Sequence, residues 1–197
     1  TPEEKELRNW LIFDVNPEKT GKVTAAGIFA KAYELNKGDT FAALLTAHNV
    51  LRANFRPEWA FQGLNSQPEL VNKIAPLRGD GEDEKGALYH FFGMATWGYA
   101  QAYYQRAAFA EGRAGEFALF SILTPKLAAE VEEKLISTNT STGRPLPDFW
   151  VDPREYVVDL AGGQLGGDLF GRIQGRDLGD LKGRYAATPA ECANLAA

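Results

Sequence analysis

Residues 152–175, DPREYVVDLAGGQLGGDLFGRIQG, decide how this chain folds. The stretch begins like a helix, because Asp152 can act as the N-cap, Pro153 suits the first helical position and Glu155 can reach back to the cap. Glycine then recurs every four residues, at 163, 167, 171 and 175, with a second pair at 162 and 166. Each glycine inside a helix costs about 0.5–1 kcal/mol relative to alanine, so the six together cost about 3–6 kcal/mol. A cost comparable to the net stability of a domain must be offset, and a second backbone lying very close to the glycines would do so.

Residues 84–111, EKGALYHFFGMATWGYAQAYYQRAAFAE, are the best candidate for that second backbone. Aromatic side chains occur around most of the helical circumference, which is typical of a central and mostly buried helix. The segment also contains small residues that permit close approach of a neighbour: Gly86, Gly93, Gly98, Ala100 and Ala107. We therefore expect it to pack against helix 153–175, and we expect Gly167→Leu to loosen the protein by overpacking that contact.

The rest of the chain also has helical features. Thr1 and Glu4 form a capping-box pattern at the start of a helix that runs to about Phe13. Further helical patterns occupy residues 25–36, 41–55, 68–77, 113–123 and 125–136. No segment shows sustained alternation of apolar and polar residues, so we expect no β-sheet. The sequence predicts an all-α single domain over residues 1–197, a bundle of about seven helices around helix 84–111, with an irregular tail at 176–197.

Residues 14–25, DVNPEKTGKVTA, resemble the calcium loop of an EF-hand. Asp14, Asn16 and Glu18 stand at alternating positions, as calcium ligands do. The loop departs from that pattern at two positions, because Lys19 replaces the glycine of the sixth position and Ala25 replaces the bidentate glutamate of the twelfth. We therefore expect a helix–loop–helix turn that binds no calcium.

Charge and motif content limit the classes of partner. The net charge is −5 and no strongly basic run is present, which argues against a nucleic-acid backbone as the main partner. No apolar run reaches the ~18–20 residues of a membrane span. The chain has no phosphate-binding loop, zinc motif or nucleophile elbow, so the sequence predicts no cofactor. A small-molecule or polymer substrate, or a protein partner, remains.

Two features favour a secreted protein. The chain begins at Thr1 rather than methionine, as a processed chain would, and Asn139-Thr140-Ser141 is a glycosylation sequon in a loop-like stretch. The single cysteine, Cys192, excludes an intrachain disulfide and fits a reducing compartment, although a chain with a large core can be secreted without disulfides. We expect secretion, with a cytoplasmic location as the alternative.

Three ionisable residues on separate predicted helices form the candidate catalytic site: His90, Glu116 and Asp159. Asp159 lies in an apolar run, where a carboxylate is costly to bury without a partner. If helix 84–111 packs on helix 153–175, His90 and Asp159 can meet, and the carboxylate would fix the tautomer of the imidazole and raise its basicity. Glu116, in a partly dry cleft, would then serve as the general acid.

These three residues also occur in a recognisable order. The segments Tyr89-His90-Phe91, Glu116 and 159–166 (DLAGGQLG) resemble a group of poorly characterised bacterial helical domains. Their pattern is an Arg-His-aromatic helix, a later glutamate and an Asp-Leu-x-Asn-Asn-x-x-Gly helix. This chain has Tyr89 in place of the arginine and Gly162-Gly163 in place of the paired asparagines, so a polar site built on those amides is lost here. The resemblance implies a shared helical fold with an undefined activity.

Two functions remain open from the sequence. In the first, the chain is an enzyme, with a hydrolase as the candidate, and its cleft contains His90, Glu116 and Asp159. In the second, it is a non-enzymatic binding or structural interaction domain, in which the three residues satisfy one another and the aromatic residues, 12% of the chain, form the core or a docking surface. A metal site that uses His48 has no ligand spacing to support it. We interpret His48, in the apolar stripe of residues 41–55, as a hydrogen-bonded core residue.

Overall fold

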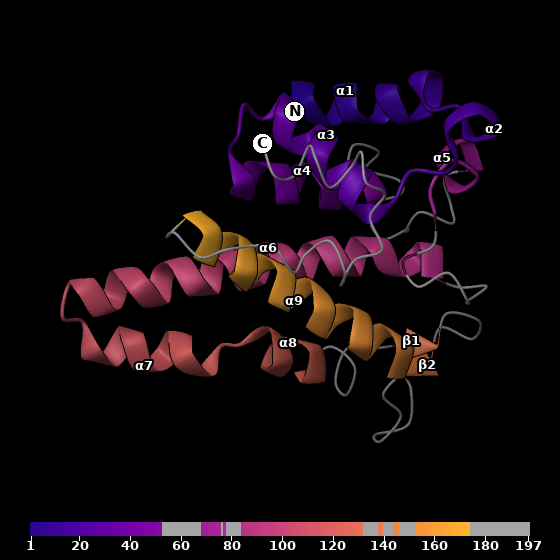
Figure 1. The fold of residues 1–197 in the computed structure, drawn as a ribbon. Helices are drawn as coiled ribbons and strands as arrows, with labels where there is room; N and C mark the ends of the chain where they lie inside the picture. The colour runs from indigo at the N-terminus through magenta and orange to yellow at the C-terminus, as the bar shows by residue number, and fades with distance from the viewer. Residues whose placement is uncertain are drawn as a thin grey trace.

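A computed structural model gives the structure of the chain and describes residues 1–52, 68–75, 77, 84–131, 138–139, 144–145 and 153–173 (Figure 1). The predicted all-α class is confirmed. In chain order the elements are α1 (Pro2–Asn9), the π-helix η1 (Trp10–Asp14), α2 (Pro17–Thr20), α3 (Ala25–Leu35), α4 (Thr40–Arg52), α5 (Pro68–Val71), α6 (Glu84–Ala110), α7 (Ala114–Ile122), α8 (Pro125–Val131), β1 (Thr138–Asn139), β2 (Arg144–Pro145) and α9 (Pro153–Ile173).

Small elements differ from the sequence prediction. The single-turn helix α2 and the antiparallel pairing of β1 with β2, which contains the sequon residue Asn139, were not predicted. Both are too short to show a periodic pattern. The predicted helix ends at 53–55, 132–136 and 174–175 lie outside the described residues, as do Cys192 and the predicted tail 176–197.

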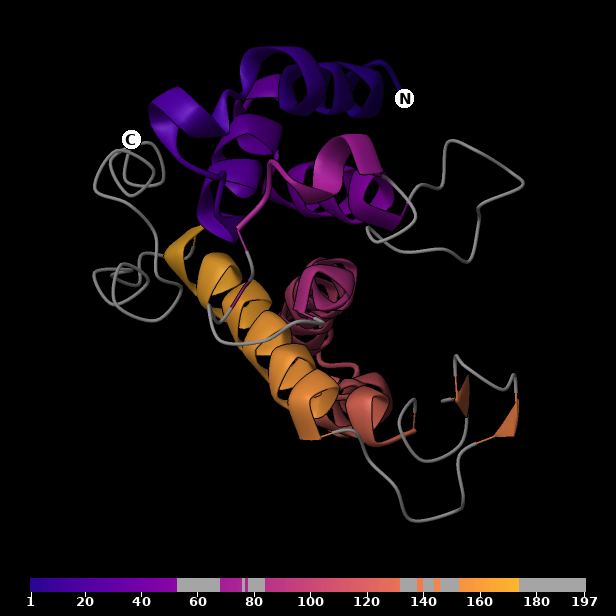
Figure 2. The ribbon, with the colours of Figure 1, turned by 90° about the vertical axis from the view of Figure 1, so that its right-hand side faces the viewer.

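The first helices form a layer that covers one side of α6 (Figures 1 and 2). Local signals fix where they begin. The hydroxyl of Thr1 accepts a hydrogen bond from the backbone of Glu4, as the capping-box pattern predicted. Thr24 caps α3, and the Asp39 carboxylate accepts from the backbone N–H of Ala42 at the start of α4. The apolar side chains of this layer join those of α6 and α9 in one core, which includes Leu7, Leu11, Ile28, Leu44, Leu51, Phe91, Phe92, Val158 and Leu165.

The turn that resembles a calcium loop is closed by backbone pairing and a lysine. Val23 forms a parallel β-bridge with Ile74. The ammonium group of Lys73 donates to the backbone carbonyls of Ile12 and Val15, at 2.7 Å for Val15. A cationic side chain that lies far along the sequence, just after α5, therefore satisfies carbonyl groups beside the turn.

Glycines bring the backbones of α6 and α9 into direct contact. A Cβ atom on Gly162 would overlap the carbonyl group of Phe91, and one on Gly166 would overlap that of Ala95. On the α6 side, a Cβ on Gly98 would overlap the carbonyl group of Gly163. The two helices lie side by side in both ribbon views (Figures 1 and 2). No residue other than glycine fits at these three positions without movement of a backbone.

Gly163 and Gly167, which belong to the four-residue repeat, do not turn their Cβ positions toward α6. A Cβ on Gly163 would meet the Pro125 side chain at the start of α8, and one on Gly167 would meet nothing within 4 Å. The prediction that Gly167→Leu overpacks a helix contact is therefore wrong. The error arose because two glycine faces, 163/167/171 and 162/166, run side by side, and their spacing does not show which one turns inward.

The predicted central helix α6 is most deeply buried in its first half. Leu88, Phe91, Phe92 and Ala95 are buried, whereas large side chains of the second half are exposed by 45–72%: Trp97, Tyr103, Tyr104 and Phe109. Aromatic residues occur around most of the circumference of this helix along its whole length. The pattern therefore gives no information about where the neighbouring helices end. In Figure 1 the second half of α6 projects beyond the N-terminal layer, together with α7.

Substituting Gly166 and Gly167 by alanine provides a matched test of this geometry. We expect Gly166→Ala to lower the free energy of unfolding by about 1–3 kcal/mol, because the new methyl group overlaps the α6 backbone. Gly167→Ala should raise it by about 0.5–1 kcal/mol, because alanine favours a helix and meets no neighbour. Urea unfolding of both variants measures the difference, and equal effects would contradict the assigned contact face.

Candidate functional site

The packing of α6 on α9 brings His90 and Asp159 together. His90 directly precedes Phe91, and Asp159 precedes Gly162 by one turn, so both lie beside the point where the two backbones touch. Nδ1 of His90 is 3.7 Å from Oδ1 of Asp159, a distance that suits an ion pair and exceeds that of a direct hydrogen bond. The Asp159 side chain is fully buried and that of His90 is 12% exposed.

Tyr89 lies between the two histidines of the chain. Its ring centroid is 4.2 Å from that of His90 and 6.4 Å from that of His48. Nδ1 of His48 lies 2.8 Å from the backbone carbonyl of Tyr89, and because a carbonyl can only accept, this nitrogen carries the proton. Gly93 leaves room for the imidazole, since a Cβ there would lie 3.0 Å from the same nitrogen. His48 is thus a hydrogen-bonded packing residue, as its place in an apolar stripe indicated.

Burial lowers the pKa of His48 below its usual value of about 6.5. The hydrogen bond to the Tyr89 carbonyl acts in the opposite direction, and the nearby Arg52 and His90 lower the pKa further. The folded protein therefore holds His48 in its neutral form at a pH where the unfolded chain binds a proton.

Glu116 lies on a different part of the molecule from the other two candidates. Its carboxylate pairs with Arg113 at the start of α7 and is half exposed. Arg113 also pairs with Glu111, at 2.8 Å. Since α7 follows the C-terminal end of α6, Glu116 is separated from His90 by most of the length of that helix, about 30 Å at 1.5 Å per residue. The spacing along the sequence carried no information on this separation.

Two pockets flank the second half of α6, and neither is lined by His90 or Asp159. One, of about 320 Å³, is lined by apolar residues that include Phe41, Trp97, Tyr104, Phe120 and Leu123. The other, of about 530 Å³, lies between α6, α7 and α9. Within the described ranges no group of three or more His, Cys, Asp or Glu side chains is placed to hold a metal ion. Both of these pockets are lined by residues of α6 and α7.

Polar side chains attach α7 to α6. The side-chain amide of Gln101 donates to the carbonyl of Phe120 at 2.7 Å, and that of Gln105 donates to the hydroxyl of Ser121 at 2.9 Å. The indole N–H of Trp97 donates to the carbonyl of Leu123 at 3.1 Å. One aromatic contact, in which the rings of Tyr104 and Phe120 stack with centroids 5.4 Å apart, adds to these bonds.

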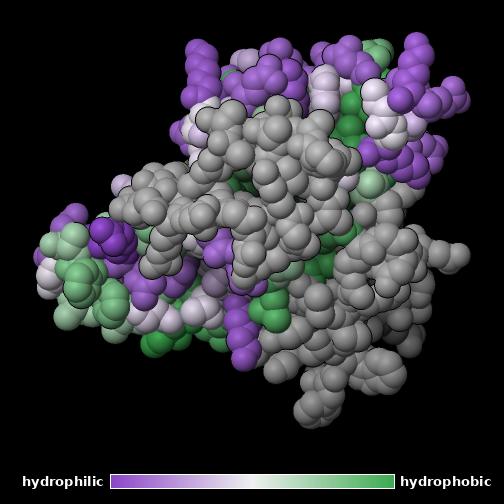
Figure 3. Space-filling model, viewed as in Figure 1, coloured by the Kyte–Doolittle hydropathy of each residue, from purple (hydrophilic) through white to green (hydrophobic). Residues whose placement is uncertain are grey.

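Two large apolar side chains of α7, Leu119 and Ile122, face solvent, whereas Phe117 and Phe120 contact aromatic rings of α6. No residue of α7 is buried, although Phe, Leu, Ile and Ala make up most of its sequence, AGEFALFSI. We define the α6–α7 apolar surface as five side chains that are each 45–72% exposed: Trp97, Tyr104, Phe109, Leu119 and Ile122. Figure 3 shows apolar colouring at the end of the molecule where Figure 1 places the α6–α7 connection. One feature of the sequence indicates this surface, namely a nine-residue helix with a single charged residue. The sequence does not indicate which side of that helix faces solvent.

No protein-family model, curated protein or solved structure matches this chain. The likeness to bacterial helical domains therefore rests on its short motifs alone. Over the described residues, no helix has both the length and the apolar character needed to cross a bilayer.

A structural role for the His90–Asp159 pair predicts a loss of stability when either side chain is changed. We expect His90→Ala and Asp159→Asn each to lower the free energy of unfolding by about 1–3 kcal/mol, because each change disrupts a buried polar pair. The two effects should not add, and a double-mutant cycle measured by urea unfolding should give a coupling of about 0.5–3 kcal/mol.

Glu116→Gln is the control for that cycle, since a half-exposed carboxylate should change stability by no more than about 0.5 kcal/mol. Additive effects at His90 and Asp159, or variants as stable as the original chain, would contradict the structural role. That result would favour a catalytic pair, because active-site residues are often held at a cost to stability.

The lowered pKa of His48 predicts how stability depends on pH. Above about pH 6.5 His48 is neutral in both the folded and the unfolded chain. As the pH falls below this value the unfolded chain takes up a proton that the folded protein resists, so the free energy of unfolding should decrease. His48→Gln should flatten this dependence between about pH 5 and 7, as measured by urea unfolding at a series of pH values. An unchanged slope would show that other groups cause the dependence.

Proposed function

We propose that this chain is a non-enzymatic interaction domain that associates with a second copy of itself through the α6–α7 apolar surface. The single observation that carries the proposal is the orientation of α7, which accepts hydrogen bonds from α6 at the Phe120 carbonyl and the Ser121 hydroxyl. Its Leu119 and Ile122 side chains face solvent. A soluble monomer rarely presents a large group of apolar side chains, and such groups mark interaction sites.

Charge supports a second copy as the partner. The chain as a whole carries −5, so two copies repel each other over most of their surface. Residues 97–123 contain two arginines and two glutamates, and their net charge is therefore zero. Three of those four residues, Glu111, Arg113 and Glu116, already pair with one another. Two copies of this end can meet without like-charge repulsion, and a two-fold axis would place the same side chains on both sides of the interface.

The expected association is weak. Covering a side chain that is about half exposed gains roughly 1 kcal/mol, so five from each copy contribute about 10 kcal/mol. Loss of translational and rotational freedom costs about 4–15 kcal/mol. These terms nearly cancel, which supports a reversible dimer rather than an obligate one.

The enzymatic alternative has less support from the geometry. His90 and Asp159 lie beside each other, but Glu116 lies at the other end of α6, and the two pockets that described residues form beside α6 are lined by other side chains. A hydrolytic site needs both a proton-transfer group and a cavity beside it for the substrate.

Light scattering coupled to size-exclusion chromatography tests the proposal. We expect the average mass to rise from that of a monomer toward that of a dimer as the protein concentration increases from about 1 μM to 1 mM. Ile122→Glu and Leu119→Glu should each keep the protein monomeric over the whole range, because a buried charge opposes association.

Phe13→Glu is the matched control. Phe13 is 76% exposed and lies in η1, outside the α6–α7 apolar surface, so this variant should associate like the original chain. Circular dichroism verifies that each variant is folded. A chain that stays monomeric at every concentration, or association that Phe13→Glu abolishes and Ile122→Glu does not, would overturn the proposal.

A further inference from the structure

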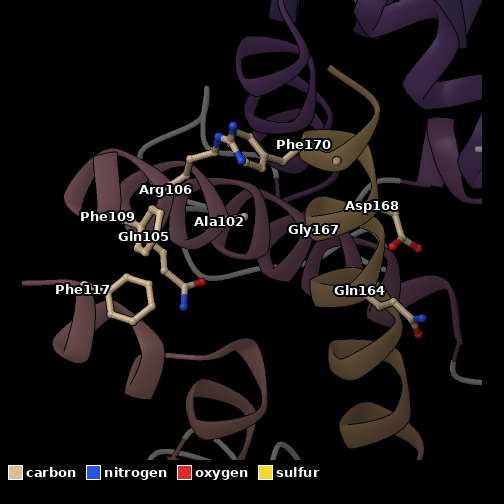
Figure 4. A pocket seen from close by; sticks show the side chains of 10 residues that line it. Ala102, Gln105, Arg106, Phe109, Phe117, Gln164, Gly167, Asp168 and Phe170 are labelled. Atoms are coloured by element: carbon tan, nitrogen blue, oxygen red, sulfur yellow. The ribbon is translucent and has the colours of Figure 1, made fainter. Parts of the chain in front are cut away.

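The larger pocket lies in the wedge where α6, α7 and α9 diverge (Figure 4). Its volume, about 530 Å³, is within the ~300–1,000 Å³ typical of pockets that bind small molecules. Small residues of α6 and α9 line it, namely Ala102, Gly167 and Gly171. A Cβ on Gly167 would meet no atom within 4 Å, so the space beside this backbone is open.

Aromatic rings line the pocket from all three helices. Phe109 of α6 and Phe117 of α7 contact each other with their ring centroids 5.7 Å apart. Phe170 of α9 contributes a third ring. Figure 4 shows these rings separated across the pocket, with Phe109 and Phe117 together and Phe170 apart from them. Faces and edges of phenylalanine favour a flat aromatic guest, through offset or edge-to-face contacts.

Arg106 gives the pocket a positive charge. Over the part of the chain that the structure describes, no hydrogen bond or ion pair to its guanidinium group is found. In Figure 4 the guanidinium group lies beside the Phe170 ring, and the carboxylate of Asp168, which also lines the pocket, points away from it. An arginine presents a planar set of donors that matches the two oxygens of a carboxylate.

We propose that this pocket binds a small aromatic carboxylate, with the ring among Phe109, Phe117 and Phe170 and the carboxylate on Arg106. This ligand site goes beyond the proposed self-association and shares one residue with that surface, Phe109, whereas Leu119 and Ile122 do not line the pocket. At 100° per residue, the pocket residues Ala102, Arg106 and Phe109 point about 120–180° away from Trp97 around α6, and Gln105 points about 80° away.

Titration with 2-naphthoate tests the site, followed by NMR chemical shifts and by isothermal calorimetry. We expect saturable binding of one molecule per chain. Arg106→Gln should weaken the binding of 2-naphthoate at least tenfold, because the carboxylate loses its charged partner. The neutral isostere 2-naphthamide should bind the original chain and Arg106→Gln equally. Equal binding of 2-naphthoate by both proteins would refute the role of Arg106.

A second test fills the pocket with a larger side chain. Gly167→Leu should abolish binding of both compounds while the protein stays folded, because the new side chain enters open space. Gly115→Leu is the matched control, since Gly115 also faces open space but does not line the pocket, and it should bind normally. No saturable binding by the original chain, or undiminished binding by Gly167→Leu, would overturn the proposal.

The same titrations with Ile122→Glu separate this inference from the proposed self-association. Ile122 does not line the pocket, so the variant should bind 2-naphthoate with unchanged affinity whether or not the original chain forms dimers. Loss of binding in this variant would show that the ligand occupies a dimer interface, which contradicts a site within one chain.

Discussion

The contact between the backbones of α6 and α9 is the constraint on which the rest of the structure depends. Gly98, Gly162 and Gly166 allow carbonyl groups and Cα atoms of the two helices to approach at distances that no side chain would permit. Glycine weakens a helix, so each of these positions reduces the stability of the isolated helix and increases that of the pair. Helix α9 therefore depends on α6 for its stability, and the glycine contacts fix the register of the two helices.

That register determines which polar groups meet inside the protein. His90 and Asp159 are neighbours because they flank the Phe91–Gly162 contact. A buried carboxylate next to an imidazole is a common feature of active sites and also of ordinary interiors, where buried polar groups satisfy one another. In the described part of the chain, Glu116 is separated from this pair, and the two pockets beside α6 are lined by other residues.

Helix α7 is attached to α6 by side-chain hydrogen bonds and not by a close backbone contact. Gln101, Gln105 and Trp97 hold α7 through hydrogen bonds, so this helix has no need to bury its own apolar residues. Polar attachment on one side and apolar exposure on the other is the reverse of the usual amphipathic arrangement. The same arrangement leaves Trp97 and Tyr104 of α6 exposed and leaves a pocket between α6, α7 and α9.

The meeting of His90 with Asp159 was predicted only on condition that the two helices pack, and their register decides it. The sequence by itself determined the all-α class, the capped start of α1 and the pairing of a glycine-rich helix with an aromatic one. These follow from local rules, since caps, helical spacing and the cost of glycine act within a few residues. Only the tertiary structure decided that Gly162 and Gly166 face α6 while Gly167 faces a pocket, that Glu116 lies at the far end, and that Leu119 and Ile122 of α7 face solvent. These features depend on how each helix is rotated about its axis and on where it ends. Two adjacent glycine faces on α9 and aromatic residues around most of α6 do not determine either quantity.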